Sequence, residues 1–161
     1  MESTVLLAFD SQLAEQLEAQ VKDTLRQITV VVSAIIAIVG SFIGSGAAGG
    51  TPIQKAAGGA LASDATPIAP GGPAFAIWSV IYLGLLAYAV WQFFPSQRHS
   101  PRQRTLGYPV ALSLLLNAAW ILSIQFGLLA LSVPVIVLLL AVLVWCFLLA
   151  LRSRPSVEST P

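Results

Sequence analysis

A run of residues without charge, from Thr105 to Leu151, constrains the fold more than any other feature of this chain. As one helix the run would be about 70 Å long, more than twice the ~30 Å hydrocarbon core of a bilayer. The run must therefore turn back. Gly127, Ser132 and Pro134 mark the turn, because glycine ends a helix, serine caps the next one and proline fits a first turn. We expect two membrane-spanning helices here, at residues 106–128 and 132–151.

The composition of the whole chain also indicates a lipid environment. Hydrophobic residues make up 57% of the 161 positions and charged residues only 9%, whereas soluble domains average about 25% charged residues. A surface so poor in charge would aggregate in water, so two further apolar stretches predict spans at residues 28–48 and 74–94. We expect an all-α integral membrane bundle of about four transmembrane helices, embedded in a lipid bilayer. The net charge of +1 and the lack of a basic patch argue against a nucleic-acid partner.

The first 27 residues differ from the spans because they hold five acidic and two basic side chains. Their apolar residues recur every four positions, a pattern that predicts an amphipathic helix. Helices that lie on membranes usually have basic polar faces, so we expect a solvated leader that leans on the bundle or on a partner. A cleavable signal peptide is the weaker alternative, because the segment is acidic. The predicted organisation is a leader at 1–27, a bundle at 28–151 and a tail at 152–161.

Basic residues set the expected orientation. Lys22 and Arg26 precede the first span, three arginines lie between the second and third spans, and Arg152 and Arg154 follow the fourth. With four spans these clusters all fall on one side, which the positive-inside rule makes cytoplasmic. We therefore expect a multi-pass protein of the cell (inner) membrane. Both termini would be cytoplasmic, and the loop at residues 49–73, rich in Gly and Pro, would be outside.

Aromatic residues form a stripe on the second predicted span. Phe75, Trp78 and Tyr82 are three and four residues apart, so a helix places them on one face. The third span has a similar set: Ser113, Asn117 and Trp120. At 1.5 Å per residue, Tyr82 and Trp120 each lie about 12 Å below the outer ends of their helices. These six residues are the candidate lining of a ligand pocket beneath the outer loop, because aromatic walls with a few polar groups are typical of such pockets.

Helix packing could explain the same residues. Trp and Tyr are enriched at both interfaces of any membrane protein. Asn117 could simply tie two helices together, at roughly 1 kcal/mol. The pattern alone therefore leaves both interpretations open, a pocket and a packed seam.

Catalytic and metal chemistry have no candidate residues in the spans. No Asp, Glu, Lys, Arg or His lies inside a predicted span, so general acid–base catalysis and proton relay have no donors there. His99, Cys146 and Met1 are the single residues of their types. A cysteine metal cluster is therefore excluded, and haem would have no His or Met ligand within the membrane. We expect no enzyme activity, no metal site and no resident cofactor.

Two motifs connect these residues to a known family. The segment Pro70-Gly-Gly-Pro-Ala-Phe-Ala-Ile-Trp-Ser-Val-Ile-Tyr82 resembles the one that opens the second helix of the TspO/MBR family. These are the tryptophan-rich sensory proteins related to the mitochondrial translocator protein. Leu116-Asn-Ala-Ala-Trp120 resembles the Leu-Asn-x-x-Trp motif of the family's third helix, and the two motifs occur in the family's order.

The resemblance implies a bundle of five helices that binds tetrapyrroles and other flat apolar ligands, often as a homodimer. By this resemblance Trp78, Tyr82, Asn117 and Trp120 would line the pocket, and Phe75 would lie near its mouth. The chain departs from the family in having four predicted spans and no tryptophan in the first loop.

The sequence therefore leaves two functions open. The first is a membrane ligand-binding or sensory protein of the TspO type, with a hydrophobic small molecule such as a porphyrin as its ligand. The alternative is a non-catalytic membrane interaction subunit, in which the aromatic and small-residue faces only pack helices or a partner. Titration with protoporphyrin distinguishes the two, because only the first requires a cavity.

Overall fold

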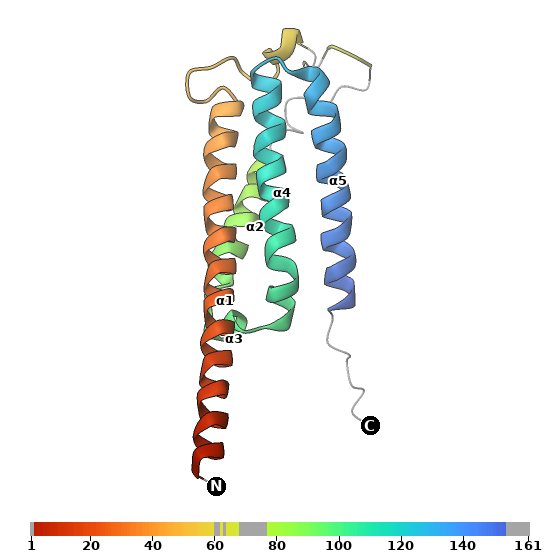
Figure 1. The fold of residues 1–161 in the computed structure, drawn as a ribbon. Helices are drawn as coiled ribbons and strands as arrows, with labels where there is room; N and C mark the ends of the chain where they lie inside the picture. The colour runs from red at the N-terminus through yellow and green to blue at the C-terminus, as the bar shows by residue number, and fades with distance from the viewer. Residues whose placement is uncertain (1, 60–61, 63, 68–76, 154–161) are drawn as a thin grey trace, which may run out of the picture.

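The computed structural model describes residues 2–59, 62, 64–67 and 77–153, and this part of the chain is a bundle of helices without strands (Figure 1). The expected all-α class is confirmed. In chain order the elements are α1 (Glu2–Gly44), the short 3-10 helix η1 (Ala56–Gly59), α2 (Ile77–Trp91), α3 (Pro95–Arg98), α4 (Pro101–Gln125) and α5 (Leu129–Arg152).

Within the described residues, three helices are long and apolar enough to cross a membrane: α1, α4 and α5. A fourth apolar helix, α2, is shorter, with 15 described residues. The chain is therefore a membrane protein with several apolar helices.

Helix α1 is one continuous rod of 43 residues. No proline interrupts it and its first glycine is Gly40, so nothing in the backbone favours a break near residue 27. The predicted boundary between leader and span is thus a change of polarity along a single helix. The part from Ile28 to Gly44 carries no charge, and most of the polar part before it extends beyond the rest of the bundle (Figure 1).

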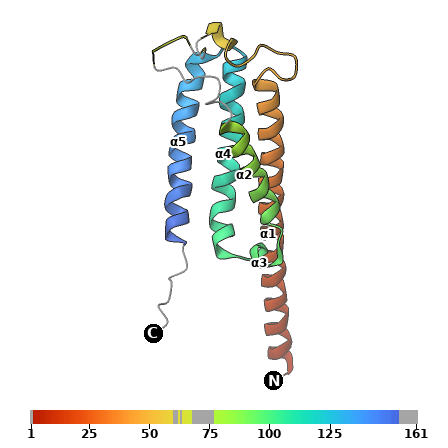
Figure 2. The same ribbon diagram turned by 180° about the vertical axis from the view of Figure 1, so that it is seen from behind.

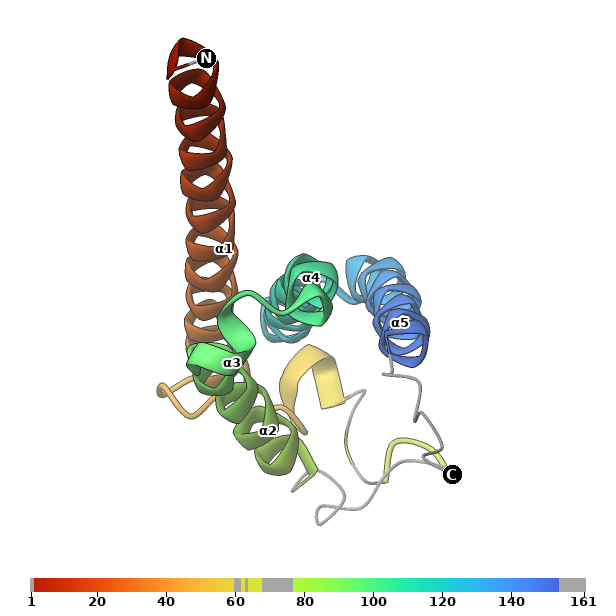
Figure 3. The same ribbon diagram turned by 90° about the horizontal axis from the view of Figure 1, so that it is seen from below.

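The bundle is centred on α4, which packs against α1 on one side and α5 on the other, while α2 packs on α1 (Figures 2 and 3). The core between α1 and α4 consists of small and medium apolar side chains: Val30, Ala34, Ala37, Ala111 and Leu114, with Ala89 of α2. Most large apolar side chains of α1 and α5 point outward instead. Such an arrangement suits a lipid solvent, in which close contact between helices requires small residues.

Two glycines of α1, Gly40 and Gly44, have the small-xxx-small spacing and lie directly against α4. A Cβ on Gly40 would be 3.1 Å from the Cβ of Ala118, and one on Gly44 would be 2.8 Å from Cγ1 of Ile121. The two backbones therefore approach as closely as glycine allows.

Replacing Gly44 with Ala should destabilise the bundle by about 1–3 kcal/mol, because the added methyl group overpacks the α1–α4 contact. The matched control is Gly84→Ala in α2, where a Cβ would meet nothing within 4 Å. Thermal unfolding in detergent should show a lower Tm for the first variant only. Equal Tm values would mean that the α1–α4 contact is looser than described.

The turn between the last two helices differs in detail from its prediction. The helix α4 ends in a Schellman motif: Gly127 adopts φ 73°, its N–H bonds the carbonyl of Ile124, and the N–H of Leu128 bonds that of Ser123. The prediction that Ser132 caps the final helix is wrong, because α5 already begins at Leu129. Ser132 lies inside it and donates to the Leu129 carbonyl at 2.8 Å.

Candidate functional site

Three of the predicted aromatic residues meet between α2 and α4. Trp78 stacks on Trp120 with ring centroids 5.6 Å apart and ring planes 16° apart. Trp78 also stacks on Tyr82, at 6.2 Å and 28°. The helical spacing that placed Trp78 and Tyr82 on one face of α2 thus directs both rings toward the Trp120 face of α4.

A cavity of about 420 Å³ lies beside these rings, within the range of small-molecule sites. It is formed where α1, α2 and α4 meet beneath the loop that follows α1. Its lining is mainly apolar, with a few hydroxyl groups: Ile38, Ser41, Phe42, Ser45, Ile53, Trp78, Ser79, Tyr82, Trp120 and Ile121.

A chain of polar contacts crosses the inner side of the cavity. The hydroxyl of Ser41 donates to the hydroxyl of Tyr82, which in turn donates to Oδ1 of Asn117 at 3.4 Å. Asn117 is only 7% exposed. The amide therefore has its partner on a neighbouring helix, and the contacts join α1, α2 and α4 at the level of the cavity. Ser41 was not predicted as a site residue, although its position directly after Gly40 of the small-xxx-small pair indicates burial at a close helix contact.

The other predicted site residues are placed differently. Ser113 is buried but donates to the Val110 carbonyl of its own helix at 2.8 Å, and it is not part of the cavity lining. Phe75 lies outside the described residues. Trp78, Tyr82 and Trp120 thus line the cavity. Asn117 does not line it but contacts the hydroxyl of Tyr82, which does.

The loop after α1 is tied down over this end of the bundle. The N–H of Ile53 bonds the Ser45 carbonyl at 3.2 Å. The side-chain amide of Gln125, oriented to satisfy its neighbours, donates to the carbonyls of Gly44 (3.2 Å) and Thr51 (3.0 Å) and accepts from the Thr51 N–H (3.2 Å). One side chain at the end of α4 therefore fixes both the end of α1 and the loop that covers the cavity.

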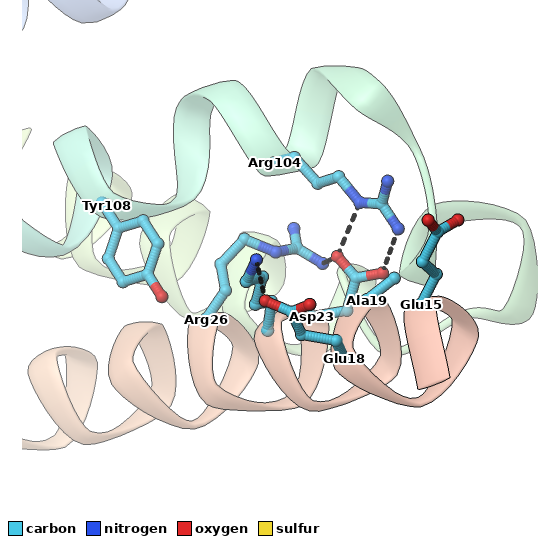
Figure 4. A pocket seen from close by; sticks show the side chains of 8 residues that line it. Glu15, Glu18, Ala19, Asp23, Arg26, Arg104 and Tyr108 are labelled. Atoms are coloured by element: carbon cyan, nitrogen blue, oxygen red, sulfur yellow. Dashed lines mark hydrogen bonds and ion pairs between the residues drawn. The ribbon is translucent and has the colours of Figure 1, made fainter. Parts of the chain in front are cut away.

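A cluster of charges lies at the opposite end of the bundle, where α1 passes α3 and the start of α4 (Figure 4). Asp23 accepts two bonds from Arg104, at 2.8 and 2.6 Å, and a third contact from Nδ1 of His99 at 2.9 Å. The bidentate Arg104 guanidinium is the main cause that lowers the pKa of Asp23 to about 2. Arg26 lies 3.7 Å from Asp23 and donates to the Arg98 carbonyl at 2.8 Å.

Both Asp23 and Arg26 have side chains that are only 2% exposed. Gly107 of α4 makes the burial of Arg26 possible, because a Cβ there would lie 2.6 Å from Cγ of the arginine. The sequence predicted a solvated leader that leans on the bundle or on a partner, but it did not identify the residues that make the contact. Asp23 and Arg26 join the polar part of α1 to the bundle, and they bring two of the predicted basic clusters together at one end.

Taken together, the fold and the cavity define a class: a helical membrane protein with an aromatic, loop-covered cavity at one end. The chain belongs to the family of TSPO-like proteins, whose family model matches residues 27–159. This family is one of membrane sensory and ligand-binding proteins and is generally non-enzymatic. No curated protein and no solved structure matches the chain.

Proposed function

We propose that this protein binds a flat apolar ligand of the tetrapyrrole class in the cavity between α1, α2 and α4, and that it acts as a binding or sensory protein and not as an enzyme. The observation that carries the proposal is the near-parallel pair of Trp78 and Trp120 on the cavity wall. The planes of the two indole rings differ by only 16°, so the rings form a stack. A planar ligand can extend this stack by offset stacking on its free face.

The contacts expected in the complex are stacking and van der Waals contacts, with hydroxyl groups on the remaining wall. Offset aromatic pairs contribute about 0.5–1.5 kcal/mol beyond the area they bury. Ser41 and Tyr82 supply hydroxyl groups at the inner side, and Ile53 of the loop lines the cavity on the other side. The loop is held by hydrogen bonds at Ile53 and Gln125 and by its short helix η1, which packs against α4.

Axial ligation to a metal has no part in this proposal. The only histidine of the sequence, His99, contacts Asp23 at the other end of the bundle. Metal-free protoporphyrin and zinc protoporphyrin should therefore bind with similar Kd values. Parallel titrations of the purified protein test this expectation. A preference of more than about tenfold for the metal-bearing form would show that a protein group ligates the metal, and would remove stacking as the main source of affinity.

We further propose that both termini and the segment between α2 and α4 are cytoplasmic. Of the described Lys and Arg residues, only Lys55 lies at the end of the bundle with the loop after α1. The others lie at or beyond the opposite end, where α3 lies, α4 begins and α5 ends (Figure 1), and this distribution supports the orientation.

Single cysteines in a Cys146→Ser background test the orientation. A cysteine at Lys55 should react with a membrane-impermeant maleimide added to intact cells, and one at Ser96 should react only after permeabilisation. Both positions are exposed in the structure. The reverse labelling pattern would overturn the orientation and leave the cavity proposal untouched.

A further inference from the structure

A second cavity, of about 530 Å³, lies between α1 and α4 at the charged end of the bundle (Figure 4). From Arg104 to Gln125, α4 rises about 32 Å, which matches the ~30 Å hydrocarbon core. With Gln125 beneath the outer loop, Arg104 lies at the opposite membrane boundary, at the depth of lipid headgroups. The cavity is lined by Glu15, Glu18, Ala19, Lys22, Asp23, Arg26, Arg104 and Tyr108.

The buried guanidinium of Arg26 has two donors without an acceptor here. Its Nε and Nη1 atoms are buried and make no hydrogen bond, while Nη2 is used by the Arg98 carbonyl. Buried donors normally have a partner. Asp23 does not supply one, because its Oδ1 lies 3.7 Å from Nη2 of Arg26, beyond hydrogen-bond distance, and neither Nε nor Nη1 bonds to it. A phosphate group, whose oxygens match the fork of a guanidinium, is the acceptor that suits these donors.

The other charged residues of the lining indicate that the ligand carries a positive group as well as a phosphate. Two carboxylates, Glu15 and Glu18, face the same cavity as the cations Lys22, Arg26 and Arg104. A ligand with negative charge alone would be repelled by these carboxylates. Among the described residues Glu15 forms no ion pair, and the pair between Glu18 and Lys22 is exposed and therefore easily exchanged. A ligand that carries both a phosphate and an ammonium group would match both halves of the lining.

An apolar strip leads from this cavity along α4 into the membrane. Tyr108 lines the cavity, and Leu112 and Leu115 follow it at helical spacing. All three side chains are exposed, at 51%, 41% and 39%. The strip offers a seat for an acyl chain, which a soluble amino phosphate does not have.

We propose that the cavity between α1 and α4 at the charged end binds the headgroup of a phospholipid with a primary amine, the chemistry of phosphatidylethanolamine. The phosphate lies on Arg26 with Lys22, the ammonium group on Glu15 and Glu18, and an acyl chain along Tyr108 and Leu112. This site is separate from the aromatic cavity, and its test does not depend on a tetrapyrrole.

Native mass spectrometry of the delipidated protein, with lipids of equal chain length added singly, tests the site. Phosphatidylethanolamine should be retained as one equivalent and bind about tenfold more tightly than phosphatidylglycerol or phosphatidylcholine. Phosphatidylglycerol lacks the amine, and the quaternary amine of phosphatidylcholine cannot donate to carboxylates. Phosphoethanolamine without acyl chains should not displace the lipid at equal concentration. Equal binding of the three lipids, or displacement by phosphoethanolamine, would overturn the proposal.

Variants localise the binding. Arg26→Gln should lower the affinity for phosphatidylethanolamine about tenfold or more, and Lys55→Gln, the same charge change at the other end of the bundle, should leave it unchanged. Because Arg26 also supports the fold, the exposed pair Glu15→Gln with Glu18→Gln provides a second test. This double variant should lose the preference for phosphatidylethanolamine over phosphatidylglycerol, whereas Asp10→Asn should keep it. A folded double variant with unchanged preference would overturn the assignment.

Discussion

Asp23→Asn should destabilise the protein by about 3–5 kcal/mol, because removing one partner of a buried ion pair leaves an uncompensated charge. The carboxylate holds Arg104 by two hydrogen bonds and lies against Arg26, whose side chain is 2% exposed. In the variant, Arg26 would stay buried without a counter-charge. The polar part of α1 would then lose its main attachment to α4.

Thermal unfolding in detergent, followed by circular dichroism, measures this effect. The control is Asp10→Asn on the exposed part of the same helix, which should change Tm little. Because the folded-state pKa of Asp23 is lowered to about 2, its stabilisation is present above the unfolded pKa of about 3.9 and is lost as pH falls from there toward 2. The difference between wild type and variant should shrink over that range. A variant as stable as the control at neutral pH would contradict the described cluster.

Trp120→Ala and Trp78→Ala should each weaken protoporphyrin binding by tenfold or more, because truncating a wall of the cavity removes both the stacking contact and the buried area. The matched control is Trp145→Ala, whose side chain lies on α5, is 49% exposed and does not line the cavity. The affinity of this control variant for protoporphyrin should stay near that of the wild type. Each variant requires confirmation that it inserts and folds, since the tryptophan pair also joins α2 to α4.

Equal affinities in the three tryptophan variants would contradict the cavity as the binding site. In that case the aromatic stack would be helix packing only. The exposed apolar side chains on the protruding part of α1, such as Phe9 and Val21, would then favour the alternative function, a non-catalytic interaction subunit.

The helices and the aromatic cluster were predictable because both depend on local spacing. A run without charge has to be helical in lipid, and residues three or four apart on a helix share a face whatever the neighbours are. Trp78 and Tyr82 illustrate the second point. The spacing within one helix does not show which residues of another helix lie against it. The contact of Ser41 with Tyr82, and the support of the loop by Gln125, were therefore found only in the structure.

The apolar periodicity of the first 27 residues does not identify Asp23 and Arg26 as the residues that contact the bundle. In the uncharged part of α1 the large apolar residues, such as Val32 and Ile35, point outward, whereas the buried seam of the helix consists mainly of small and polar residues. This seam recurs at intervals of three and four, as in Asp23, Gln27, Val30, Ala34 and Ala37. In lipid, apolar residues gain nothing by facing inward, so the small and polar positions mark the contact. The same periodicity applied to those positions would have placed Asp23 and Arg26 against α4.

The most direct measurement of the central claim is a titration of a variant in which Trp91 and Trp145 are replaced by Phe, so that Trp78 and Trp120 are the only tryptophans left. Metal-free protoporphyrin should quench their fluorescence in a saturable way at one ligand per chain, since both rings line one cavity. Quenching that rises linearly with porphyrin, as for a dye dissolved in the detergent micelle, or no quenching at all, would contradict a ligand site at these two residues.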